Sequence, residues 1–173
     1  MNPSTPSSTT HDDASGAKRH VVDVEQMTRA EFRERHPFLF LIRWSSIIQC
    51  VRRSLLEVGT DPYLNALRAR RRIDAQAVRP VDDSGIATIG RAPECAIYVD
   101  DLSASKLHAW LQVVDGELRL FDAHSRNGTW IEKVGVQPDG GGIVVQLGVT
   151  VRFGHAEYLL LDADAYWDLV RLF

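Results

Sequence analysis

Apolar and polar residues follow two different periods along this chain. From Ala75 onward, apolar side chains recur at every second position in short runs, which is the period of a half-buried β-strand. Turn-forming pairs such as Asp115-Gly116 separate these runs. Many short strands joined by tight turns predict a mainly β fold, an antiparallel β-sandwich. The expected strands cover residues 76–81, 86–89, 96–99, 109–114, 117–121, 129–131, 143–147, 150–153 and 157–161.

Before Ala75 the spacing of apolar residues is helical. Thr28 can cap a helix within residues 23–36, with Glu31 three positions on as its capping-box partner. Pro37 ends this helix, because the residue before a proline avoids the helical region of backbone space. Two further helices are expected, over residues 44–58 and 61–72.

The apolar run Phe38–Ile42 fits two structures equally well, a short buried strand or the start of a buried helix. The sequence also leaves open whether the segment before residue 75 docks on the sandwich or stands apart from it. Asp162 or Asp164 can cap a closing helix. We therefore divide the chain into a disordered Ser/Thr-rich tail (1–20), a helical N-terminal extension (21–74), a β-sandwich (75–162) and a short C-terminal helix (163–173).

Charge is unevenly distributed along the chain. The net charge of −3 comes from 20 Lys and Arg against 23 Asp and Glu. Residues 1–80 hold 13 of these cations against 9 anions, a net +4, and residues 81–173 hold 7 against 14, a net −7. We expect no nucleic-acid partner for the sandwich, because such partners require a basic face. The basic run Arg68–Arg72 fits a solvated helix end, or a contact for an acidic partner or nucleic acid.

Three features predict a soluble cytoplasmic protein with no membrane association. Cys50 and Cys95 lie far apart and without metal-like spacing, which indicates reduced thiols. The N-terminus lacks the charged start and apolar run of a signal peptide. The longest apolar stretch, Pro37–Ile42, is too short to span a bilayer.

Three short motifs in the second half of the chain suit the binding of an anion. In Gly90-Arg91, the planar guanidinium matches the geometry of phosphate oxygens. Ser105-Lys106 supplies a hydroxyl and a compact positive charge. In Asn127-Gly128, the amide can bond to both polar groups of a peptide main chain, and the glycine permits a tight turn. Together these motifs predict a phosphopeptide-binding site.

The order and spacing of these motifs resemble the forkhead-associated (FHA) domain. The matching pattern runs Gly-Arg, Ser-x-x-His and Asp-x-x-Ser-x-Asn-Gly-Thr between Gly90 and Thr129, and residues 147–154 resemble the closing strands. The resemblance covers roughly residues 75–161. It implies an FHA-like sandwich that recognises phosphothreonine through loops at one end, as an adaptor in Ser/Thr kinase signalling. The partner it implies is a phosphothreonine-containing protein, either a Ser/Thr kinase or a kinase substrate.

The resemblance also assigns a role to each motif residue. Those that would contact or position the phosphate are Arg91, Ser105, Lys106 and Arg126. Asn127 would hold the main chain of the ligand peptide. Those that would shape the site without touching the ligand are Gly90, His108, Gly128 and Thr129. One departure from the pattern is Ala104, which precedes Ser105 where an apolar β-branched residue is common.

Catalytic readings of the same residues fit less well. His108 beside Ser105 suggests a base and a nucleophile, with Asp122 as orienter, but no oxyanion-hole motif accompanies Ser105. The chain has no Walker loop, kinase catalytic loop or metal-binding carboxylate set, so we predict no enzyme, no cofactor and no metal. The alternative function is a phosphate-independent interaction scaffold or oligomerisation module. It is motivated by the hydrophobic residues of Phe38–Trp44 and by Trp167.

Overall fold

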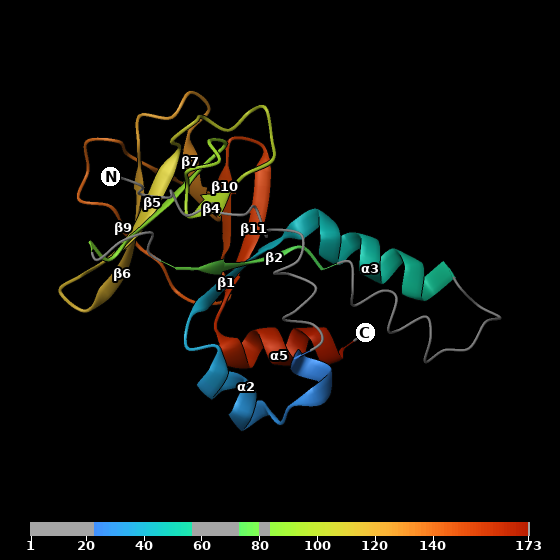
Figure 1. Ribbon diagram of the computed structural model, residues 1–173. Helices are drawn as coiled ribbons and strands as arrows, with labels where there is room; N and C mark the ends of the chain where they lie inside the picture. The colour runs from blue at the N-terminus through green and yellow to red at the C-terminus, as the bar shows by residue number, and fades with distance from the viewer. Residues whose placement is uncertain (1–22, 57–72, 80–83, 173) are drawn as a thin grey trace, which may run out of the picture.

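Two β-sheets pack face to face in the computed structural model, which describes residues 23–56, 73–79 and 84–172 (Figure 1). One sheet has the strand order β2 (Ala75–Val78), β1 (Leu39–Arg43), β11 (Ala156–Leu161), β10 (Thr150–Phe153), β7 (Thr129–Ile131) and β8 (Val134–Val136). The other has the order β4 (Ile97–Tyr98), β3 (Ile86–Gly90), β5 (Ala109–Val114), β6 (Glu117–Asp122) and β9 (Ile143–Val144). Neighbouring strands are antiparallel except β3 and β4, which are parallel. The predicted mainly β sandwich is confirmed.

The sandwich core follows from alternation along the strands. In the β5–β6 hairpin Leu111 lies opposite Leu120, and both side chains are buried between the sheets. Asp115 and Gly116 turn this hairpin with φ angles of 53° and 80°, which is the left-handed geometry that matches the twist of the strands. The hairpin predicted from Asp115-Gly116 is therefore confirmed.

The sequence pattern missed strand β8. Its three residues, Val134-Gly135-Val136, pair with β7 after a tight turn at Glu132. Gly135 carries no side chain to show alternation, and glycine is depleted in strands. A Cβ atom there would lie 3.4 Å from the Trp130 ring, an ordinary van der Waals contact, so close packing does not require this glycine.

Helices α2 (Arg29–Arg35), α3 (Trp44–Leu56) and α5 (Ala163–Arg171) accompany the sandwich, and residues 23–26 form a further helical turn. Thr28 caps α2 in a capping box with Glu31, as predicted. Of the two aspartates that could cap α5, Asp162 does so, because its side chain accepts from the main-chain N–H of Ala165 at 2.8 Å. In Figure 1, α2 and α5 lie together below the sheets, and α3 projects to the right.

The segment predicted as a helical extension contains a strand of the sheet. Strand β1 lies between β2 and β11, so the sheet includes a strand from before residue 75. Leu41 belongs to the core between the sheets, whereas Phe40 and Ile42 belong to a second core formed with the helices. Because both faces of β1 are covered, its sequence shows no alternation, and the period alone did not separate strand from helix.

The second core shows that the N-terminal residues dock on the sandwich. The Phe40 and Tyr166 rings stack with their centroids 4.3 Å apart, which joins β1 to α5. Buried members of this core come from each element around it: Val24, Phe32, Phe40, Ile42, Ile47, Cys50, Ile73, Tyr166 and Val170. The question of whether residues 23–56 stand apart is thereby settled for the described part of the chain.

Some predictions fall outside the described residues. These are the tail over 1–20, the helix over 61–72 and the basic run Arg68–Arg72. Within the described segments, no helix has the length and apolar character needed to cross a bilayer.

Candidate functional site

Three loops meet at the end of the sandwich where β3, β6 and β10 finish, the upper end in Figure 1. The main-chain N–H of Arg91 donates to the Ser105 carbonyl oxygen at 2.9 Å. The main-chain N–H of Arg126 donates to the Ser105 hydroxyl at 3.0 Å, and the Asn127 amide donates to the Ser103 carbonyl oxygen at 2.7 Å. The three sequence motifs, up to 37 residues apart between Gly90 and Asn127, therefore form one surface.

Gly90 permits the first two loops to approach each other. A Cβ atom at this position would lie 2.1 Å from the Lys106 carbonyl oxygen, far inside van der Waals contact. The same carbonyl oxygen accepts from the main-chain N–H of Ala92 at 2.9 Å. Close packing of backbone on backbone thus requires a glycine at this position, directly before Arg91.

Arg91 is held by its neighbours in a way that leaves its terminal nitrogens available. Its Nε donates to the Ala104 carbonyl oxygen at 3.3 Å, and the side chain is half-buried. Among the described residues, nothing accepts a hydrogen bond from its two Nη atoms. The Asp101 carboxylate lies 3.6 Å from Arg43, and no ion pair joins Arg91 to another described residue.

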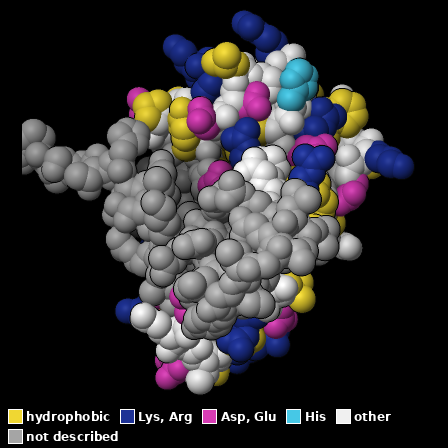
Figure 2. Space-filling view, turned by 90° about the vertical axis from the view of Figure 1, so that its right-hand side faces the viewer, with side chains coloured by type: hydrophobic (Ala, Val, Ile, Leu, Met, Phe, Trp, Pro, Cys, Tyr) yellow, Lys and Arg dark blue, Asp and Glu magenta, His cyan; other side chains and the backbone are white. Residues whose placement is uncertain are grey.

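Ser105 sits at the centre of the loop surface. Its hydroxyl oxygen accepts from Arg126, so its own hydroxyl proton is available to a ligand. The side chains of Lys106, which follows Ser105 in the sequence, and of Arg126, which bonds to Ser105, are both exposed. Three of the seven cations of residues 81–173 therefore gather in these loops, although that segment carries a net −7. Figure 2 shows Lys and Arg side chains at this upper end of the molecule, among hydrophobic ones.

His108 braces the loops from inside the sandwich. It is fully buried, and its Nδ1 accepts from the main-chain N–H of Ser105 at 2.9 Å. Its Nε2 lies 3.1 Å from the Gly128 carbonyl oxygen, which requires a proton on that nitrogen. Burial lowers the pKa of His108 below its ordinary value, although the Gly128 carbonyl and Asp122 act in the opposite direction. The imidazole is therefore neutral and links two loops.

Asp122 has a structural role that the sequence analysis did not assign to it. Its buried carboxylate accepts from the main-chain N–H of Ser125 at 2.9 Å, from the Ser125 hydroxyl at 2.6 Å and from the Thr129 hydroxyl. These bonds fix the loop that carries Arg126 and Asn127. A signal was present in the sequence, because aspartate at the end of a strand often accepts from main-chain groups of the following turn.

Asn127 and Gly128 form the rim of the surface. Gly128 has a φ angle of 77°, a backbone conformation that favours glycine. One of the two N–H groups of the Asn127 amide donates to Ser103, and the amide's carbonyl oxygen is in place to accept from a ligand main chain. Every residue predicted to contact the ligand thus lies on the same three loops.

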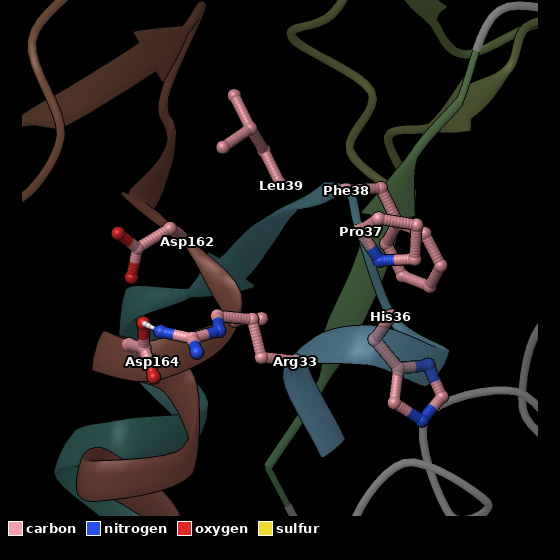
Figure 3. Close-up of a pocket in the computed structure, with 8 residues that line it drawn as sticks. Arg33, His36, Pro37, Phe38, Leu39, Asp162 and Asp164 are labelled. Carbon is pink, nitrogen blue, oxygen red and sulfur yellow. Dashed lines mark hydrogen bonds and ion pairs between the residues drawn. The ribbon is translucent and has the colours of Figure 1, made fainter. Parts of the chain in front are cut away.

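A separate hollow of about 260 Å³ lies at the opposite end of the sandwich (Figure 3). It is lined by residues of α2, β1 and α5, and Arg33 closes one side through an ion pair with Asp164 at 3.4 Å. None of the sequence-predicted site residues lines it. In the described segments, no group of three or more His, Cys, Asp and Glu side chains is placed to hold a metal ion.

Known proteins are similar in sequence to the segment that carries the three loops. The family model described as "FHA domain" matches residues 87–154. The oxoglutarate dehydrogenase inhibitor of Corynebacterium efficiens is 30% identical over 109 residues, which cover 62% of this chain and 74% of that protein. The inhibitor of the same name from Corynebacterium glutamicum is 30% identical over 104 residues, covering 60% of this chain and 70% of that protein.

A solved structure of the FHA domain of the CT664 protein from Chlamydia trachomatis has a TM-score of 0.46 at 18% identity. It covers 72% of this chain and 96% of that domain. The family match spans the three loops that carry the sequence motifs and the strands between them, from β3 to the end of β10. The chain therefore belongs to the FHA domain family, whose members recognise phosphothreonine.

Proposed function

We propose that this protein is an adaptor that binds a phosphothreonine peptide in Ser/Thr kinase signalling, with the ligand held by the loops around Ser105. The observation that carries this proposal is the position of the Ser105 hydroxyl. The main-chain N–H of Arg126 donates to the Ser105 hydroxyl oxygen, while the proton of the Ser105 hydroxyl remains available to a ligand. Arg91 and Lys106 flank it with positive charge. A dianionic phosphate fits this arrangement because it presents several strong acceptor oxygens.

Each loop residue has a role in the proposal. The two free Nη atoms of Arg91 donate to phosphate oxygens, and the Ser105 hydroxyl adds a charge-assisted bond. Lys106 and Arg126 contribute exposed positive charge at the rim. Asn127 accepts from the ligand main chain, and Gly90, His108, Gly128 and Thr129 hold the loops in place.

We include the absence of catalysis in this proposal. A serine nucleophile needs a base within hydrogen-bond reach of its hydroxyl. Both ring nitrogens of His108 already bond to main-chain groups, one to Ser105 and the other to Gly128. The buried carboxylate of Asp122 is bonded to Ser125 and Thr129 rather than to the imidazole. The same three residues that suggest a catalytic triad in the sequence are thus used to support the loops.

The partner in this proposal is a phosphothreonine-containing protein, a Ser/Thr kinase or one of its substrates. Two relatives are named as inhibitors of oxoglutarate dehydrogenase, which makes that enzyme a candidate to test for this chain. A cytoplasmic location belongs to the proposal as well. It is supported by the wide separation of Cys50 and Cys95 in the sequence and their lack of metal-like spacing, which fit reduced thiols in a reducing compartment.

The test is fluorescence polarisation with a degenerate phosphothreonine peptide library and its unphosphorylated counterpart. We expect phosphate-dependent binding to wild-type protein that weakens about tenfold or more in Arg91→Ala, since a charge-assisted bond contributes roughly 1.5–3 kcal/mol. Arg35→Ala is the matched control, because it removes the same charge from exposed α2 at the other end of the molecule. Equal affinities of Arg91→Ala and wild type would refute the proposed site.

The scaffold alternative has less support from the packing. Of the hydrophobic residues that motivate it, Phe40, Leu41 and Ile42 are completely buried within the chain's own cores. Trp167 is half-buried and lies against Arg171, whose guanidinium is 4.5 Å from the ring centroid. An increase of molecular mass with concentration, measured by sedimentation, would favour the alternative.

A further inference from the structure

We propose that a groove between α3 and the β10–β11 turn binds a large apolar side chain of the same phosphopeptide. The inference rests on the proposed function and adds a second specificity site to it. The groove encloses about 420 Å³, a size typical of ligand pockets. Residues from two distant parts of the chain line it: Trp44, Ile48, Gln49 and Arg52 on α3, and His155 and Glu157 at the turn.

Helix α3 presents an apolar stripe that its own fold does not bury. Ile47 and Cys50 face the second core, with exposures of 7% and 0%. Trp44, Ile48 and Val51, by contrast, are 38%, 41% and 39% exposed. Their spacing of four and three residues places them in one row along the helix. The helix therefore carries two apolar faces, and the one formed by Trp44, Ile48 and Val51 is partly exposed to solvent.

The groove is continuous with the phosphopeptide loops. Ser103 connects them: its carbonyl oxygen accepts from Asn127 at 2.7 Å, and its hydroxyl accepts from the main-chain N–H of His155 at 2.7 Å. Gly154 packs so closely on this residue that a Cβ atom there would lie 2.6 Å from the Ser103 hydroxyl. Only Ser103 therefore separates Asn127 from the groove, so a peptide held by Asn127 can extend into the groove.

Arg43 fixes the start of α3 against the same loop. Its guanidinium donates to the Asp100 carbonyl oxygen at 3.1 Å and lies 3.6 Å from the Asp101 carboxylate. Asp101 in turn accepts from the Ser103 hydroxyl at 2.6 Å. These contacts hold the groove and the loops in one orientation, so a single peptide can contact both without a rearrangement of the chain.

The chemistry of the groove selects its occupant. Trp44 and Ile48 offer apolar surface, which favours a large apolar side chain such as Leu, Ile or Phe. Arg52 is exposed and forms no ion pair with any described residue, so it favours an acidic residue beside the apolar one. Gln49 and Ser45 also line the groove, and their amide and hydroxyl groups can form hydrogen bonds with the peptide main chain.

The experiment sorts a phosphothreonine peptide library, degenerate at the flanking positions, on wild type, Ile48→Gln and Val113→Gln. Ile48→Gln replaces an exposed helix residue by a polar one of similar size. Val113→Gln is the matched control, because Val113 is 61% exposed on the β5–β6 hairpin at the other end of the sandwich. We expect wild type and the control to enrich an apolar residue at one flanking position. Ile48→Gln should lose this preference and bind the selected peptide about fivefold to tenfold more weakly.

The outcomes separate the two proposals. Binding that ignores the phosphate in wild-type protein would refute the proposed function itself. Phosphate-dependent binding with no apolar preference, or with the same preference in Ile48→Gln, would refute only the groove. A wild-type dimer in sedimentation that becomes a monomer in Ile48→Gln would assign the groove to a second copy of the chain and so overturn the inference.

Discussion

The main-chain N–H of Arg126 donates to the hydroxyl of Ser105 at 3.0 Å, joining two loops that are 21 residues apart in sequence. The bond uses a lone pair of the hydroxyl and leaves its proton free. The loops are thus placed before any ligand arrives, which reduces the entropy lost on binding. The surface around Ser105 is preorganised for an acceptor such as phosphate.

Replacement of Ser105 tests this arrangement directly. Ser105→Ala removes both the bond to Arg126 and the donor offered to the phosphate, so phosphopeptide affinity should fall about tenfold or more. Isothermal titration calorimetry measures the change, with Ser84→Ala in the exposed turn before β3 as the control. The melting temperature should change little, because the loop bond is exposed to solvent. An unchanged affinity would show that the hydroxyl does not contact the ligand.

Gly90→Ala is expected to damage both stability and binding. The added methyl group would lie 2.1 Å from the Lys106 carbonyl oxygen, so the loops must separate, at a cost of about 1–3 kcal/mol. Gly141→Ala is the control, since nothing lies within 4 Å of a Cβ atom there. Thermal denaturation should give a melting temperature several degrees lower for Gly90→Ala only. Equal melting temperatures would contradict the close approach of the loops.

Asp122→Asn should destabilise the protein while preserving the shape of the side chain. The amide cannot accept all the bonds that the carboxylate accepts from Ser125 and Thr129, and each bond to a charged group contributes roughly 1.5–3 kcal/mol. Asp139→Asn is the matched control, because that carboxylate is 91% exposed and lies beside only His124. Urea unfolding measures both variants. Similar free energies of unfolding for the two would remove Asp122 from its supporting role.

Stability should depend on pH through two buried histidines. Burial lowers the pKa of His108 and of His36, so the folded state keeps both neutral where the unfolded chain already binds protons. The contribution of these histidines to the free energy of unfolding is therefore constant above a pH of about 6.5 and falls as the pH decreases below it. Each histidine contributes a slope of at most about 1.4 kcal/mol per pH unit.

Urea unfolding over this pH range measures the effect, and His108→Asn should remove the share of the slope that comes from His108. Peptide binding is a poorer readout, because the phosphate itself gains a proton near pH 6. A slope that is the same in His108→Asn and in wild type would show that His108 does not titrate on unfolding.

The sequence by itself determined the local features of this protein. Alternation predicted most strands, Thr28 and Glu31 predicted a helix start, and Asp115-Gly116 predicted a hairpin. The three loop motifs predicted the FHA family and, with it, the end of the sandwich that carries the candidate site. These predictions succeed because each depends on residues only a few positions apart, whose periodicity and turn preferences are written in the chain itself.

Only the tertiary structure decided the features that join distant residues. It placed Phe40 and Ile42 in a second core and Leu41 in the first, which makes β1 a strand of the sheet. It also placed α3 beside the β10–β11 turn, where the groove forms. A strand that is covered on both faces shows no alternation of apolar and polar residues in its sequence. A groove between segments more than 100 residues apart in the chain leaves no local sequence pattern.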